Sequence, residues 1–310
     1  MTSEFGPLIV VLGPTASGKS SLGVSLAREM GGEILACDST QIYRHFDIGT
    51  AKVPRAEQHG IAHHLTDLVE PNEVFTAGEY RRRAQEVLAD LRRRGKVPVI
   101  TAGTGLYLRA LLEGLAEAPA RSEELRERLR RRAREGGGEH LHRILKRLDA
   151  EAGARIAPRD TQKVIRAIEM RILTGKPVGE IHRAGREALR GYRVIKIGLA
   201  PERAELYARI NARVEAMIAA GWVGEVQELI GMGVAREAKA FQFIGYAELR
   251  EHIEGRLALE AAMAKIEQVT RNFAKRQITW FRKEPGVRWL AGFGDDSKIV
   301  SEALEIASVR

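Results

Sequence analysis

Cysteine is nearly absent from the sequence, with Cys37 the single example in 310 residues. One thiol cannot build a disulfide framework, so we expect a reducing, cytoplasmic location. Apolar runs of the roughly 18 residues that span a bilayer are also missing. The first residues, "MTSEFGPLIVVL", show neither a basic leader nor a small-residue cleavage site. We therefore expect no signal peptide and no membrane partner.

Aromatic residues are scarce at 5%, whereas 29% of residues are charged and 44% are hydrophobic, which is typical of a soluble globular protein. The formal net charge is +9, and the excess is mostly arginine. The arginine runs at 81–83 and 92–94 are typical of solvated helix faces. The denser "LRERLRRRAR" at 125–134 suits a polyanionic partner if other features support one.

Strand-like and helix-like segments alternate, which predicts an α/β fold with a parallel, P-loop-type sheet flanked by helices. The expected strands are "LIVVL" (8–12), "EILACDS" (33–39), "KVPVIT" (96–101) and "YRVIKIGLA" (192–200). Residues 115–190 predict a small helical insertion domain with a turn at "EGGGEH" (135–140). The core then comprises 1–114 and 191–310, and its C-terminal region is helical over 202–220, 222–231, 245–254 and 257–283.

The strongest motif is "GPTASGKS" at 13–20, which follows the first strand and fits the P-loop pattern G-x-x-x-x-G-K-[ST]. Its backbone N–H groups and the following helix N-terminus form a cradle for anions. Lys19 adds a positive charge, and the Ser20 hydroxyl suits Mg²⁺. The motif usually binds ATP or another nucleotide. The expected phosphate-binding residues are Gly13, Pro14, Thr15, Ala16, Ser17, Gly18, Lys19 and Ser20.

An acid is missing from the ends of the strands at 96–101 and 192–200, where many P-loop enzymes carry one. Asp38, at the end of the second strand, is the only acid well placed near the P-loop. It is a candidate general base, and the alternative is that it caps the following turn. A Rossmann ribose acid is excluded because the first turn lacks G-x-G-x-x-G.

The last long helix contains "TRNFAKRQITWFR" at 270–282. At 100° per residue its cations form two stripes, which favours nucleic acid and makes Arg276 and Arg282 candidate contacts. We expect Trp280 and Phe281 to pack into the core. For the histidines of "HGIAHHL" (59–65) we expect a structural role rather than a zinc site.

Taken together, the motifs resemble those of the bacterial tRNA dimethylallyltransferase (tRNA isopentenyltransferase) family. The resemblance is carried, in the family's order and over nearly the whole chain, by "GPTASGKS" (13–20), "DSTQIYR" (38–44), "DIGTAK" (47–52), "HHLTD" (63–67), "AGTGLYL" (102–108), "QFIGYAEL" (242–249) and "AKRQITWFR" (274–282). "TAGTG" stands where the family commonly has "VGGTG", and we expect no functional consequence.

The resemblance implies transfer of a dimethylallyl group from its diphosphate to N6 of the adenosine on the 3′ side of a tRNA anticodon. The P-loop would hold the diphosphate, which is the leaving group, with Mg²⁺ at Ser20 as cofactor. Asp38 would act as general base, Thr104 would assist the transition state, and Arg213 would reach the diphosphate.

The resemblance also implies contacts to the tRNA anticodon stem-loop, with the insertion as a clamp. The family's tRNA-contacting positions correspond here to Asp38, Ser39, Thr40 and Gln41; to Arg126; to Gln162, Lys163, Val164, Ile165 and Arg166; and to Phe241, Gln242, Phe243, Ile244, Gly245 and Tyr246. We expect the protein to be a monomer.

Three other functions remain open at this point. A nucleotide kinase would hold ATP in the P-loop and use the insertion as a lid. A non-catalytic RNA-binding protein would keep the P-loop as a relic, although Lys19, Ser20 and Asp38 are intact. Prenylation of free AMP or ADP would use the same chemistry without the long basic C-terminal region.

Overall fold

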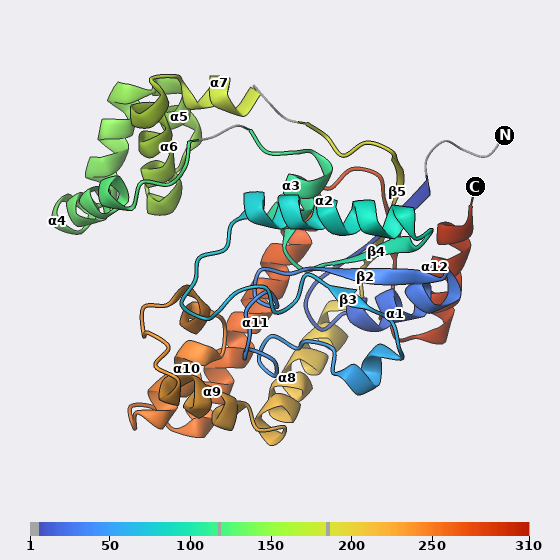
Figure 1. Ribbon diagram of the computed structural model, residues 1–310. Coiled ribbons are helices and arrows are strands. Elements are labelled where there is room, and N and C mark those ends of the chain that lie inside the picture. Colours follow the sequence, from blue (N-terminus) through green and yellow to red (C-terminus); the bar gives the residue numbers. More distant parts are fainter. Residues whose placement is uncertain (1–5, 117–118, 184–186, 310) are drawn as a thin grey trace. The chain divides into compact units, whose positions relative to one another are not determined.

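The sheet is parallel throughout and has the strand order β3-β2-β4-β1-β5-β6 in the computed structural model, which describes residues 6–116, 119–183 and 187–309. This confirms the predicted α/β fold with a parallel sheet (Figure 1). The strands are β1 (Gly6–Leu12), β2 (Gly32–Cys37), β3 (His63–His64), β4 (Val97–Ala102), β5 (Tyr192–Leu199) and β6 (Val287–Leu290). Both edge strands were missed by the sequence reading, because two and four residues are too few to show a period.

The helices of the core are α1 (Lys19–Glu29), α2 (Ala77–Arg93), α3 (Gly105–Leu112), α8 (Arg203–Ala219), α9 (Trp222–Gly231), α10 (Tyr246–Ile253), α11 (Leu259–Phe281) and α12 (Ser297–Ser308), with short 3₁₀ turns η1 (Arg55–Gln58) and η2 (Lys239–Gln242). Helices α8 to α11 begin and end within two residues of the limits predicted from the sequence. Helix α12 was not anticipated. It packs against α1 and the strands β5 and β6.

The sheet is buried on both faces, as the continuous apolar run of β1 requires. On one face, Ile9 and Val11 pack with Leu22 and Leu26 of α1 and with Ile299 of α12 in one core cluster. Helix α2 lies across the opposite face (Figure 1). Each fully buried aliphatic side chain contributes roughly 1.5–3 kcal/mol, so the sheet is a rigid base for the loops at its edge.

Strand register aligns three loops at the carboxyl edge of this sheet. Leu12 of β1 lies opposite Ala102 of β4, and Ala102 lies opposite Cys37 of β2. The next residues along these strands are Gly13, Asp38 and Gly103, so they emerge side by side. The P-loop, the acidic turn and the loop after β4 therefore begin at one point in space, where α/β proteins bind ligands.

A second compact unit comprises residues 112–189, whereas 1–111 and 190–310 form the other. The sequence-based limits of the insertion were 115 and 190. Its helices are α4 (Glu123–Leu148), α5 (Ala150–Arg155), α6 (Thr161–Thr174) and α7 (Val178–Arg183). At Gly137, φ is 77°, which breaks α4 within the stretch predicted as a turn. The unit has its own core, which includes Leu141, Val164 and Ile168.

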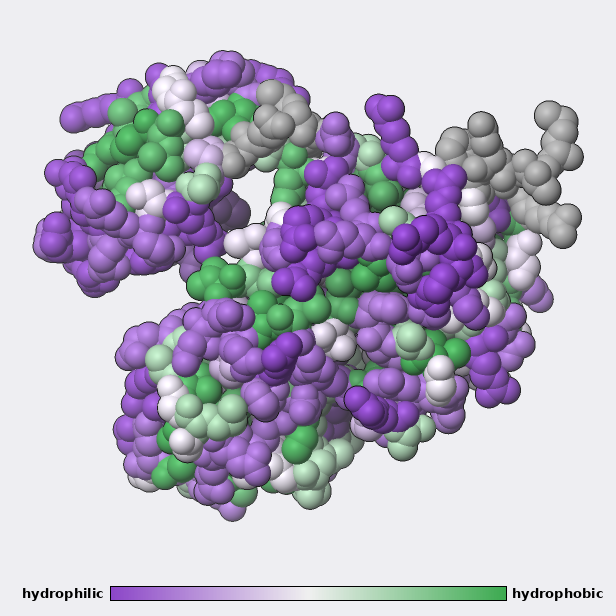
Figure 2. Space-filling view, in the orientation of Figure 1, coloured by the Kyte–Doolittle hydropathy of each residue, from purple (hydrophilic) through white to green (hydrophobic). Residues whose placement is uncertain are grey.

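Hydrophilic residues cover most of the visible surface of the described chain (Figure 2). None of the described helices is both long and apolar enough to cross a membrane.

Candidate active site

The P-loop contains tight backbone turns, with positive φ at Gly13, Ala16 and Gly18. Gly18 has a φ of 84°, and a Cβ there would lie 2.7 Å from the Gly294 nitrogen. The Gly294 N–H also donates to the Ser17 carbonyl at 2.9 Å. The turn before α12 therefore supports the loop from behind, and the start of α1 at Lys19 points its free N–H groups at the cleft in front.

Lys19 provides the charge of this cradle. Its ammonium donates to the Pro14 carbonyl at 2.7 Å, which holds the side chain across the loop. Burial lowers the pKa of Lys19 to about 8, a shift that the charge of Asp38 opposes and that of Arg213 enhances. A bound anion would favour the protonated form, so Lys19 is poised to respond to a phosphate.

Asp38 caps the following turn and also faces the cleft, so its cap does not conflict with the predicted role as a base. Its Oδ1 accepts hydrogen bonds from the Thr40 N–H at 2.8 Å and the Thr40 hydroxyl at 2.6 Å, so the carboxylate does cap the following turn. Its Oδ2 lies against the Cα of Gly103, where a Cβ would collide with it. The half-buried carboxylate also lines the cleft beside the P-loop. One oxygen is thus fixed by the turn, while the group as a whole stays accessible to a ligand.

Thr104 and Arg213 approach Asp38 from different elements. The Thr104 hydroxyl accepts from the Ser39 N–H at 2.9 Å and donates to the Ser39 hydroxyl at 3.2 Å, which ties the loop after β4 to the acidic turn. Arg213 reaches the cleft from α8. Burial lowers the pKa of Arg213, and the negative charge of Asp38 opposes that shift.

The cleft between these groups has a volume of about 680 Å³, enough for a small diphosphate ester together with part of a second substrate. It brings together most, though not all, of the residues proposed for catalysis and phosphate binding. Those on its wall are Thr15, Ala16, Gly18, Lys19, Ser20, Asp38 and Arg213, and Gln41 also lines it. Thr104 stands behind Ser39 rather than on the wall.

Gln277 of α11 also lines the cleft and was not singled out from the sequence. Its side-chain oxygen accepts from the Thr15 N–H at 2.7 Å, and its side-chain nitrogen donates to the Gly103 carbonyl at 2.8 Å. The sequence nevertheless contains a pattern that could have identified Gln277. Gln277 lies three residues after Ala274 and four before Phe281, so a polar residue interrupts the buried face of the helix.

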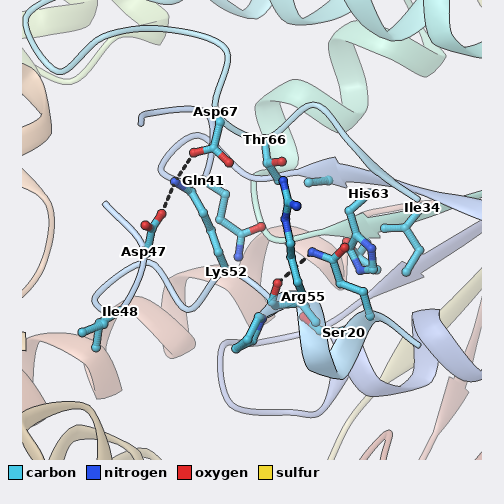
Figure 3. Close-up of a pocket in the computed structure, with 15 residues that line it drawn as sticks. Ser20, Ile34, Gln41, Asp47, Ile48, Lys52, Arg55, His63, Thr66 and Asp67 are labelled. Atoms are coloured by element: carbon cyan, nitrogen blue, oxygen red, sulfur yellow. Dashed lines mark hydrogen bonds and ion pairs between the residues drawn. The ribbon is translucent and has the colours of Figure 1, made fainter. Parts of the chain in front are cut away.

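A second pocket of about 340 Å³ adjoins the cleft at Ser20 and Thr101 (Figure 3). Lys52 crosses its side, and its ammonium contacts Asp47 at 2.7 Å and Asp67 at 2.5 Å. In Figure 3 the Arg55 side chain points toward Thr66. Lys52 therefore joins two of the sequence motifs, "DIGTAK" and "HHLTD", into one wall.

The histidines beside this wall have structural partners. Nδ1 of His63 lies 2.9 Å from the Ile61 carbonyl, and Nε2 of His64 lies 2.7 Å from Glu33. Burial lowers the pKa of His63. Throughout the described ranges, no group of three or more His, Cys, Asp or Glu side chains is arranged to hold a metal ion.

The two basic stripes of α11 are only partly available to a ligand. Arg276 and Arg282 are exposed, whereas Arg271 is partly buried and bonds to Asn211. Phe281 is buried, as expected. The same expectation for Trp280 is wrong, because that side chain is 38% exposed. Its indole packs so closely against Gly105 that a Cβ there would collide with it, and the Arg109 guanidinium lies 4.8 Å from the ring centroid.

The runs proposed to contact tRNA contain both buried and exposed side chains. Those of Val164, Ile165, Phe241 and Tyr246 are buried. The Tyr246 hydroxyl donates to Glu225 at 2.6 Å within the protein. The exposed side chains are Gln162, Lys163 and Gln242, with Phe243 and Ile244 partly exposed. Together with Arg166, whose side chain is 31% exposed, these are the side chains of the runs 162–166 and 241–246 that a ligand can reach.

Arg126 and Arg166 of the insertion share one buried carboxylate, that of Glu169. Arg126 donates to it at 2.8 and 2.7 Å, and Arg166 donates at 2.5 Å. Burial raises the pKa of Glu169, but these hydrogen bonds outweigh burial and lower it to about 2. Removing both arginines would leave the buried Glu169 carboxylate without a cationic partner, which costs about 3–5 kcal/mol.

Comparisons with known proteins agree on one family. The family model described as "IPP transferase" matches residues 41–284. Curated relatives named tRNA dimethylallyltransferase include those of Koribacter versatilis (52% identical over 299 residues, 96% of this chain and 97% of the relative) and Solibacter usitatus (51% over 300 residues, 96% and 97%).

Solved structures extend the likeness to three dimensions. The tRNA isopentenylpyrophosphate transferase of Bacillus halodurans is 35% identical with a TM-score of 0.70, and the match covers 97% of this chain and 98% of that one. A eukaryotic dimethylallyltransferase described as acting on tRNA has a TM-score of 0.77 over 92% of this chain and 74% of its own. At 24% identity, that second match supports the fold alone.

The lowered pKa of Lys19 leads to a prediction about anion binding. Affinity for sulfate, whose own charge is constant from pH 6 to 10, should fall by about tenfold as the pH rises through about 8, because Lys19 loses its proton and with it a charge-assisted hydrogen bond. Isothermal titration calorimetry across this range measures it. Lys19→Met should bind sulfate weakly and without this pH dependence. If Lys19→Met bound sulfate with the same pH dependence as wild type, that dependence would not come from Lys19.

Proposed function

This chain belongs to the IPP transferase family, the tRNA dimethylallyltransferases, and on that premise we propose that it transfers a dimethylallyl group from dimethylallyl diphosphate to N6 of the adenosine on the 3′ side of a tRNA anticodon. The observation that carries this proposal is the single cleft that joins the P-loop to Asp38. An anion cradle and a carboxylate on one wall suit a reaction with a diphosphate leaving group and a proton to remove.

The donor diphosphate lies in the P-loop, against the N–H groups at the start of α1 and the ammonium of Lys19. During transfer the bond between the allylic carbon and the diphosphate oxygen breaks, and negative charge builds on the leaving group. That side of the cleft carries the oriented N–H groups of the P-loop and two cationic side chains, Lys19 and Arg213. These groups stabilise the negative charge as it develops. Attack takes place at carbon rather than at phosphorus.

The acceptor amine of adenine is a weak nucleophile because its lone pair is delocalised into the ring. A new bond forms between N6 and the allylic carbon, and the N6 proton passes to the Asp38 carboxylate. Since Thr40 occupies Oδ1, Oδ2 on the Gly103 side is the oxygen that receives the proton. Thr104 positions the acidic turn through Ser39, which keeps the base in place.

The residues on the cleft wall fit Mg²⁺ as cofactor. A hydroxyl from Ser20 and a carboxylate from Asp38 are hard oxygen donors, and Mg²⁺ is commonly held by one or two protein oxygens, substrate phosphates and water. When bound, the ion would neutralise charge on the diphosphate. Ser20 is the protein ligand that we propose.

The polyanionic substrate accounts for the basic balance of the chain. The arginines at 82–83 and 93–94 are paired with Glu79, Glu86, Asp90 and Glu33, which supports reading these two clusters as solvated helix faces. Arg276 of α11 and Arg282, the residue that caps its C-terminal end, are exposed, and no ion pair to either occurs among the described residues. We propose that α11 and the insertion, residues 115–190 as read from the sequence, bind the anticodon stem-loop. The cleft is lined by residues of this one chain, and we propose a cytoplasmic monomer.

The function is tested by offering three acceptors to the purified protein with labelled dimethylallyl diphosphate and Mg²⁺. We expect label in a tRNA stem-loop with adenosine 3′ to the anticodon, and none in AMP. The same loop with guanosine at that position should stay unlabelled, because a flipped base is read at its edge. Label in AMP alone would replace the proposed substrate, and phosphate transfer from ATP would identify a kinase.

The assignment of Asp38 as general base predicts that Asp38→Ala lowers the single-turnover rate by about 10²- to 10⁴-fold at saturating Mg²⁺ and donor. Donor and tRNA affinity should change little, because the P-loop and the basic surfaces are untouched. Asp38→Asn keeps the shape and a weak oxygen ligand but cannot accept a proton, so it should be nearly as inactive. Asp90→Asn, at an acid on α2, is the matched control. Recovery of Asp38→Asn in excess Mg²⁺ would show a metal-site role instead.

The exposed cations of α11 predict a salt-dependent affinity for tRNA. Replacing Arg276 and Arg282 together by Ala should flatten the plot of log affinity against log salt by about one unit per arginine. Arg82→Ala with Arg93→Ala removes the same charge from α2 and should leave the slope almost unchanged, because those guanidiniums are already paired. A wild-type slope for Arg276→Ala with Arg282→Ala would mean that α11 does not face the RNA.

A further inference from the structure

We propose that Gln277 is a positioning residue that sets the separation between the donor loop and the acceptor side of the cleft. Through this separation it aligns the allylic carbon with the attacking nitrogen. The inference rests on the proposed function and deepens it, since it concerns how the two substrates are brought into register. It assigns Gln277 no proton transfer and no charge of its own.

The geometry of Gln277 is that of a bridge between two loops that are distant in sequence. Gln277 is only 6% exposed, and its carboxamide bonds to the Thr15 N–H of the P-loop at 2.7 Å and to the Gly103 carbonyl at 2.8 Å. One planar group therefore joins α11 to both sides of the cleft. Each loop is bonded at its backbone, so a movement of either one is passed to the other.

The bridge requires a carboxamide in one orientation. The partner at Thr15 is an N–H donor and the partner at Gly103 is a carbonyl acceptor, so the oxygen must face the first and the nitrogen must face the second. Because both partners are backbone groups in a shielded site, losing the bridge leaves a donor and an acceptor unpaired. A hydrocarbon side chain of similar size fills the space and makes neither bond.

The acceptor-side partner lies directly against the proposed base. Oδ2 of Asp38 packs on the Cα of Gly103, and the next residue, Thr104, bonds to Ser39 of the acidic turn. The donor-side partner, Thr15, lies within the phosphate cradle. A shift in the bridge thus changes the distance between leaving group and base, and a misplacement of about 1 Å can cost about 10²-fold in rate.

The first test is Gln277→Leu, measured by single-turnover transfer to a tRNA stem-loop at saturating donor. We expect the rate constant to fall by about 10²-fold, while the fraction of enzyme that reacts and the affinity for tRNA stay unchanged. A purely structural role would lower the reacting fraction and leave the rate constant alone. Gln227→Leu, at an exposed glutamine of α9, is the matched control and should behave as wild type.

The second test is Gln277→Glu, followed as a function of pH. The ionised carboxylate of the variant still accepts the hydrogen bond from the Thr15 N–H. Its second oxygen faces the oxygen of the Gly103 carbonyl, and because both are acceptors, the bond on that side is lost. The protonated acid has a hydroxyl donor and a carbonyl acceptor, and it restores both bonds. The ratio of variant to wild-type rate should therefore rise as the pH falls. Lys19, Asp38 and Arg213 line the cleft in both proteins, so the variant is compared with wild type at each pH.

The outcomes separate this inference from the function on which it rests. If wild type labels no tRNA, the proposed function fails. If wild type is active and Gln277→Leu reacts at the wild-type rate, the bridge has no positioning role. A reduced reacting fraction with an unchanged rate constant would assign Gln277 to folding alone. A pH-independent ratio for Gln277→Glu would overturn the two-sided hydrogen bond as the cause.

Discussion

The register of three parallel strands is the constraint on which the site depends. Since Cys37 and Leu12 both pair with Ala102, the residues that follow them emerge side by side at one edge of the sheet. Buried apolar packing on both faces prevents the strands from slipping, because a shift by one residue would turn every side chain to the wrong face. An anion cradle, a carboxylate and a glycine-lined loop are thereby placed within one cleft before any ligand arrives.

Polar contacts then close this arrangement from outside the sheet. Gln277 reaches in from α11, Arg213 from α8, and the turn at Gly294 supports the P-loop from behind. All three come from the C-terminal 110 or so residues, and the P-loop and Asp38 come from the first 40. The chemistry of the site therefore depends on the docking of α8 and α11 against the loops at the edge of the sheet.

The arginines show how the same residue type serves different ends. In the insertion, Arg126 and Arg166 neutralise buried Glu169, and along α2 the arginines pair with nearby acids. On α11, Arg276 and Arg282 are exposed. Composition records only the excess of positive charge. Which part of that excess faces a polyanion depends on where acidic partners lie in space, and this is a property of the folded chain.

The sequence by itself determined the α/β class, the P-loop, the acid at position 38 and the family, because each rests on local spacing or on short motifs. It also predicted where helices α8 to α11 begin and end to within a few residues, because hydrophobic period and capping are local features of the sequence. The edge strands β3 and β6 were too short to show a period, and α12 went unrecognised. Only the tertiary structure revealed that Trp280 is exposed, that Tyr246 is buried, and that Gln277 joins Thr15 to Gly103 across 262 and 174 residues of sequence. Such contacts depend on how helices pack, and packing is decided by surfaces that meet only after the chain has folded.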